Sequence, residues 1–218
     1  RAWTSSISVY SSHDYRYTPI VTSFFSLLSH LPLRGAAIIW FLLNLGILLA
    51  GFAYWARVAW PGRRDRDYIC VVLLAATPMM IGNLNNLQAN PLVLGLMLTA
   101  FAASIEKRFL LCAACAVIIA SLKIYPLAAG LLLLLFFPLP MFWRLVCGLS
   151  IAFLVPFLTQ STAYVWQSYT DLCGSLSHDS RFDVPLILAY KNAALIWRQL
   201  GGPLTPGVFL NIQLGTAV

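Results

Sequence analysis

The sequence predicts an all-α fold, a polytopic bundle of helices that crosses a lipid bilayer. Three observations support this prediction. Of the 218 residues, 60% are hydrophobic and only 10% are charged, whereas soluble domains carry roughly 25% charged residues. The apolar residues gather in runs about as long as a membrane-crossing helix. The polar residues fall between these runs, so they would sit at the membrane surfaces.

We expect about six transmembrane helices and one juxtamembrane helix. A crossing helix needs roughly 17–25 apolar residues, and residues 35–56, GAAIIWFLLNLGILLAGFAYWA, meet this best. The other candidate spans are 68–82, 90–105, 109–123, 125–138 and 142–159. Segment 19–32 is short and rich in serine, which favours a helix lying at the membrane interface. Residues 109–138 would form one long stretch if KIYP did not break it, and proline favours the break.

Basic residues indicate which loops face the cytoplasm, where Lys and Arg concentrate. Residues 57–67 hold four arginines, residues 106–108 hold two basic residues, and Arg144 lies in a short turn. If six spans alternate, these loops share the cytoplasmic side. Residues 1–34, the loop 82–91, the turn at Lys123 and the segment from 160 then share the extracytoplasmic side.

The chain divides into three parts on this interpretation. Residues 1–34 form an extracytoplasmic loop with the juxtamembrane helix, 35–159 form the transmembrane bundle, and 160–218 form a further extracytoplasmic loop and the start of another segment. The sequence starts at Arg1 and stops after NIQLGTAV. We therefore expect a fragment of a longer membrane protein.

The net charge of +7 does not indicate nucleic acid as a partner, because basic residues in membrane proteins mostly record topology. Four of the five cysteines lie in apolar runs, where a thiol is usually a small core side chain. Cys112 and Cys115 have no other metal-ligand residue nearby. We expect neither a disulfide nor a metal site, and no cofactor.

The loop GNLNNLQANP (82–91) carries five amides between two apolar runs. They are Asn83, Asn85, Asn86, Gln88 and Asn90. The simplest interpretation is a turn that caps two helices, with Asn90 as an N-cap and Pro91 as the first helical residue. Capping accounts for two or three amides but not for five. Amides also donate and accept hydrogen bonds without charge, which suits sugar hydroxyls and phosphate oxygens.

Lys123 stands at the start of KIYP, next to Tyr125 and Pro126. A lysine beside a membrane span often extends its ammonium to the interface without further function. A cation at a break between two helices also suits an anionic lipid phosphate. The residues alone leave both interpretations open.

The segment HDYRYTP (13–19) holds a second group of candidates. Asp14 is either a solvated surface carboxylate or a general base for an acceptor hydroxyl. Arg16 either binds phosphate or pairs with Asp14, and Tyr15 and Tyr17 either contact substrate or belong to an interfacial aromatic belt. Four further polar residues either complete a site or form an ordinary loop: His178, Asp179, Arg181 and Asp183.

Three of these segments, in this order, make the chain resemble glycosyltransferase family 87, membrane enzymes of the GT-C superfamily. The first is the aromatic-x-Tyr-x-Pro element YRYTP. The second is the Gly-Asn-rich opening of a span, GNLNNLQANPLVLGL, and the third is the Lys-x-x-Pro element KIYPLAAGLLLL. The resemblance covers roughly residues 14–160.

The resemblance implies a multi-pass membrane enzyme, expected in a bacterial plasma membrane. It would transfer a mannose-like sugar, with inversion, from a polyprenyl-phosphate donor to a lipid or glycan acceptor at the extracytoplasmic face. A carboxylate of the first extracytoplasmic loop would be the base, either Asp14 or a residue outside this sequence. Arg16, Lys123 and Tyr125 would hold the donor phosphate. Tyr15, Tyr17 and the five amides would contact the substrates.

Three other functions use some of the same features. A transporter or channel would place polar residues near the middle of the membrane, but Asn44 is nearly the only polar side chain of its predicted span. A lipid flippase would also handle a phosphate-bearing lipid. A noncatalytic scaffold would tolerate alanine throughout the amide loop, whereas a transferase would not.

Overall fold

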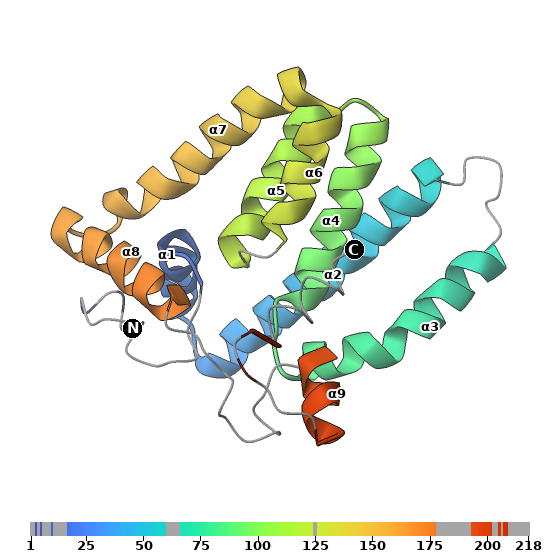
Figure 1. The fold of residues 1–218 in the computed structure, drawn as a ribbon, viewed down its shortest axis with the longest axis horizontal. Helices are drawn as coiled ribbons and strands as arrows, with labels where there is room; N and C mark the ends of the chain where they lie inside the picture. Colours follow the sequence, from blue (N-terminus) through green and yellow to red (C-terminus); the bar gives the residue numbers. More distant parts are fainter. Residues whose placement is uncertain are drawn as a thin grey trace. The chain divides into compact units, whose positions relative to one another are not determined.

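The computed structural model describes residues 3, 5, 10, 17–59, 66–123, 126–177, 193–201, 205 and 207–208. Every regular element within these residues is helical (Figure 1), which confirms the predicted all-α class. The helices are α1 (Pro19–Leu28), α2 (Leu33–Ala59), α3 (Arg66–Asn85), α4 (Asn90–Ile105), α5 (Phe109–Leu122), α6 (Leu127–Phe136), α7 (Pro138–Leu154), the 3₁₀ turn η2 (Val155–Leu158), α8 (Thr162–Ser177) and α9 (Ala193–Gln199).

Helices α2 to α7 follow the predicted apolar runs, whereas α8 and α9 lie in residues 160–218, which were predicted as a loop and the start of another segment. Helix α4 spans residues 90–105 as predicted, and α1 occupies the segment predicted as a juxtamembrane helix. The break at KIYP is also confirmed. Helix α5 ends at Leu122, and Lys123 is extended with φ −150° and ψ 133°. Helix α6 then begins at Leu127, directly after Pro126.

Two stretches of the described chain are long and apolar enough to cross a membrane. They are Leu33–Ala59, with 27 residues, and Pro138–Leu158, with 21 residues. Helices α4, α5 and α6 are apolar but have only 16, 14 and 10 residues. The bundle thus contains membrane-length helices, but the six crossings remain a prediction. Together with the low charge content, these helices indicate a membrane protein.

The chain separates into two compact units, residues 1–172 and residues 173–218. In the first unit, α2 packs on α4, α4 on α5, and α5 on both α6 and α7 (Figure 1). Helix α9 belongs to the second unit. The predicted boundaries at residues 34 and 159 stay predictions.

Helices α2 and α4 cross with their backbones in contact. A Cβ atom added to Gly51 would lie 2.0 Å from the carbonyl oxygen of Gly95. One added to Gly95 would lie 2.4 Å from the carbonyl oxygen of Ile47. Small residues allow this approach between helices in a membrane. The crossing brings the amino-terminal half of α2 beside the start of α4, where the polar side chains gather.

Candidate functional site

A cluster of four polar side chains joins the ends of α3, α4 and α5. Asn90 donates a hydrogen bond from Nδ2 to Asn83 Oδ1 at 2.5 Å and to Gln88 Oε1 at 2.9 Å. Its own Oδ1 accepts a hydrogen bond from Lys123 Nζ. Asn83, Gln88, Asn90 and Lys123 are called the amide–lysine cluster below. Asn90 lies at its centre, because its donor and acceptor groups are both engaged.

The turn after α3 brings the amides of this cluster together. Gln88 N donates to Asn83 O at 2.9 Å, and Leu87 N donates to Leu84 O at 3.0 Å. Between them Leu87 adopts a left-handed backbone with φ 52°. This is a common way for a helix to end, although glycine usually occupies the left-handed position. The tight turn places Gln88 back over the last turn of α3, near Asn83.

The expectation that Asn90 caps α4 is wrong. The N-cap is Ala89, and no side chain of the N-cap residue makes a capping bond, although Pro91 does lie in the first turn as predicted. The Asn90 amide is engaged by the cluster instead. Asn44 of α2 takes over part of the capping role, since its Oδ1 accepts a hydrogen bond from the backbone N–H of Leu92 at 3.3 Å.

Two side chains of α2 hold the amide loop in place. Asn44, only 1% exposed, also donates from Nδ2 to the carbonyl of Trp40 at 2.9 Å. The buried Trp40 donates from Nε1 to the carbonyl of Leu87 at 2.8 Å. In the sequence, Asn44 stands out only as an isolated polar residue of a predicted span. The role of Trp40 was not predicted, because a tryptophan within an apolar run carries no local signal for a loop contact.

Replacing Asn44 by leucine is expected to destabilise the protein by about 1–3 kcal/mol, because the buried N–H of Leu92 would lose its acceptor. Thermal unfolding in detergent micelles measures this effect. Asn85→Leu is the matched control, since it makes the same chemical change at an exposed amide. Equal unfolding temperatures for Asn44→Leu and the wild type would contradict the capping role.

The segment at Tyr17 lies beside the end of α5. Thr18 donates from Oγ1 to the carbonyl of Ser121 at 2.8 Å, two residues before Lys123. Tyr17 stacks edge-to-face on Phe25, with ring centroids 5.9 Å apart, and burial raises the pKa of its hydroxyl. Phe25 in turn packs edge-to-face against Trp40, with ring centroids 4.9 Å apart. The aromatic residues thus link the predicted YRYTP element to the wall of the site.

An apolar cavity of about 370 Å³ begins next to the cluster. Helices α1, α2, α4, α5 and α7 line it, and among the described residues of its wall Ser121 alone carries a hydroxyl group. Leu122 and Leu92 belong to its wall, and they lie one and two residues from Lys123 and Asn90. Partial burial lowers the pKa of the Lys123 ammonium. The site therefore joins a cation and amide groups to a space suited to hydrocarbon.

Several predicted residues do not join this cluster. Asn85 and Asn86 are exposed, and their side chains make no hydrogen bond to the described residues. Four candidates lie outside the described residues: Asp14, Tyr15, Arg16 and Tyr125. The polar group at 178–183 also lies outside them. Asn85 and Asn86 are therefore not placed in the proposed site, and the roles of the other residues stay predictions.

The fold and the site define a class of protein, a helical membrane protein with a polar site next to an apolar cavity. Within this class, the chain belongs to glycosyltransferase family 87, whose family model matches residues 15–215. No curated protein and no solved structure matches the chain. The resemblance seen in the sequence is thus confirmed. Membership implies a glycosyltransferase, with a sugar donor and an acceptor as substrates.

Proposed function

We propose that this chain forms the transfer site of a multi-pass membrane glycosyltransferase that uses a polyprenyl-phosphate sugar. A mannose-like sugar would pass, with inversion, to a lipid or glycan acceptor. The observation that carries the proposal is the position of the amide–lysine cluster beside the apolar cavity. Such a donor has an anionic phosphate, a sugar rich in hydroxyls and a hydrocarbon chain. Lys123, the amides and the apolar cavity would bind these three parts in turn.

In this reaction the acceptor hydroxyl attacks the anomeric carbon from the face opposite the phosphate. The bond from that carbon to the phosphate oxygen breaks, and its electron pair leaves with the phosphate. Lys123 would stabilise the charge that develops there, as a fixed cation does in other transfer reactions. Arg16 and Tyr125 are proposed to assist it. Asp14 is the proposed base for the hydroxyl proton, unless that base lies outside this sequence.

The amides and the cavities would orient the two substrates. Asn83 and Gln88 would offer amide donors and acceptors to sugar hydroxyls, and Asn90 would orient them and offer the second lone pair of its Oδ1. Tyr15 and Tyr17 are proposed as further contacts. The first prenyl units would enter the cavity lined by α1, α2, α4, α5 and α7. A second cavity of about 520 Å³, lined by α1, the start of α2 and Leu87, offers space for the chain of a lipid acceptor.

The site is proposed to face the extracytoplasmic side of a bacterial plasma membrane. The amide–lysine cluster lies at the start of α4, and the basic turn 106–108 lies directly after its end. Since basic loops favour the cytoplasm, the cluster would lie at the opposite surface. Polyprenyl-phosphate sugars would be used there without a nucleotide.

The proposal is tested by measuring transfer from labelled polyprenyl-phosphate mannose to mixed lipid acceptors, in membranes that contain the protein. The double variant Asn83→Ala, Asn90→Ala is expected to lose transfer by about a hundredfold, the scale of losing a positioned donor at a reacting centre. The matched control is Asn85→Ala, Asn86→Ala, which removes two exposed amides of the same loop.

The control is expected to keep transfer within about twofold of the wild type, in line with the small effect of exposed substitutions. Immunoblotting of the membranes verifies that both double variants are inserted in equal amounts. Equal activity of the two double variants would refute the assignment of the cluster. A loss in both would mean that Asn85 and Asn86 also contact the substrates, as the sequence predicts, and would refute the restriction of the site to the amide–lysine cluster.

A further inference from the structure

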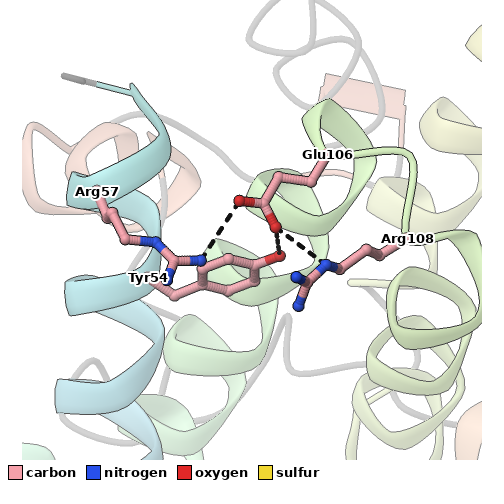
Figure 2. A network of polar contacts seen from close by, with 4 residues as sticks. All are labelled: Tyr54, Arg57, Glu106 and Arg108. Atoms are coloured by element: carbon pink, nitrogen blue, oxygen red, sulfur yellow. Dashed lines mark hydrogen bonds and ion pairs between the residues drawn. The ribbon is translucent and has the colours of Figure 1, made fainter.

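A second polar network lies at the other end of α4, away from the amide–lysine cluster. Glu106, directly after α4, accepts a hydrogen bond from Tyr54 Oη at 2.7 Å (Figure 2). The same carboxylate pairs with Arg57 Nη2 at 3.3 Å and with Arg108 Nε at 3.1 Å. Tyr54 and Arg57 come from the last two turns of α2. One carboxylate therefore pairs with two guanidinium groups, one from α2 and one from the turn between α4 and α5.

The two guanidinium groups remain open to solvent. The side chains of Arg57 and Arg108 are 59% and 62% exposed. Arg108 meets Glu106 through Nε, and Figure 2 shows its two terminal nitrogens directed away from that carboxylate. These are the atoms with which arginine binds phosphate in a bidentate manner. The Glu106 carboxylate is already engaged by Tyr54, and this hydrogen bond and the two arginines lower its pKa.

A third cation and an apolar rim complete this surface. The exposed Lys107 stands between Glu106 and Arg108 in a left-handed backbone with φ 59°. The turn and the end of α2 thus carry three cations against one carboxylate. Three aliphatic side chains beside the turn are exposed: Ile105, Leu110 and Leu111. Cations next to exposed hydrocarbon, at the end of a membrane-length helix, match the two parts of a phospholipid.

We propose that Arg57, Lys107 and Arg108 bind the phosphate of an anionic membrane phospholipid, whose acyl chains cover Ile105, Leu110 and Leu111. Glu106 acts as a positioning residue that keeps the two guanidinium groups together. Basic residues at a membrane surface attract anionic headgroups in this way. The site is separate from the transfer site, since α4 lies between them and is about 24 Å long by the rise of a regular helix.

The test uses the whole protein, reconstituted in nanodiscs of mixed phosphatidylglycerol and phosphatidylcholine, and native mass spectrometry of the lipids that it retains. The wild type is expected to retain phosphatidylglycerol preferentially. Arg57→Gln, Arg108→Gln is expected to reduce this preference by about fivefold for each cation removed. Arg144→Gln is the matched control, because it removes an exposed cation outside the network and should keep the preference.

Lys107→Gln separates lipid binding from folding. The Lys107 side chain takes no part in the network around Glu106, so this variant should fold normally and lose about fivefold in preference. An unchanged preference in both Lys107→Gln and the double variant would overturn the proposal. Equal retention of phosphatidylcholine by the wild type would also overturn it. Displacement of the lipid by millimolar inorganic phosphate would show a site for free phosphate instead.

Discussion

Replacing Lys123 by methionine is expected to lower the rate constant of sugar transfer by about a hundredfold or more. Methionine keeps much of the length of the side chain but removes the charge that would stabilise the leaving phosphate. The hydrogen bond to Asn90 Oδ1 is lost as well, so the central amide would also lose its orientation. The measurement is kcat with a labelled polyprenyl-phosphate sugar at saturating donor, for equal amounts of inserted protein.

Lys123→Arg is the matched control, because it retains the positive charge and should keep a substantial part of the activity. The pH profile provides a second control. On the proposed role the charged form of Lys123 would be the active one, and burial lowers the pKa of Lys123. Activity of the wild type should therefore decline with rising pH earlier than for an ordinary lysine, whereas Lys123→Arg should show no decline in that range. An unchanged kcat in Lys123→Met would contradict the role of the cation.

Replacing Gly95 by valine is expected to destabilise the bundle by about 3 kcal/mol or more, at the upper end of overpacking effects. The new Cβ would lie 2.4 Å from the carbonyl oxygen of Ile47 and 2.7 Å from Leu48 Cα. Because these are backbone atoms, the valine side chain fits only if helices α2 and α4 move apart. The same crossing aligns Trp40 with Leu87 and Asn44 with Leu92. Because these contacts hold the amide loop, the variant should also lose transfer activity.

Gly46→Ala is the control for this experiment, since it lies on α2 and a Cβ added there meets no atom within 4 Å. It is expected to leave the unfolding temperature unchanged or to raise it, because alanine favours a helix by up to about 1 kcal/mol over glycine. The measurement is thermal unfolding in detergent, followed by circular dichroism. Similar unfolding temperatures for the two variants would show that the glycine contact does not hold the helices together.

The sequence predicted the helices well, because apolar run length and proline act locally. Residues 90–105 become α4, and the chain breaks at Lys123 as the KIYP element indicates. The number of membrane crossings is harder to predict from the same runs. Helix α6 has only 10 residues, so an apolar run identifies a buried or lipid-facing helix without showing that it spans the bilayer.

The site was predicted in outline only. The alternation of basic loops predicts that Lys123 and the amide loop share one side, and the bond from Lys123 to Asn90 places them together. The left-handed turn at Leu87 decides which amides join the cluster. This turn could not be predicted from the sequence, because no glycine occupies the left-handed position. The capping of α4 was mispredicted because its partner, Asn44, lies 48 residues before Leu92. Local sequence rules do not capture such a contact.

The most direct test of the central claim is the affinity of the protein in nanodiscs for two lipids, a polyprenyl phosphate and the corresponding polyprenol. Both would fill the apolar cavity on the proposed function, but only the first carries the anion for Lys123. The wild type should bind the phosphate at least about tenfold more tightly, which corresponds to about 1.4 kcal/mol, and Lys123→Met should lose most of this preference. An undiminished preference for the phosphate in Lys123→Met would contradict the assignment of Lys123 to the donor phosphate.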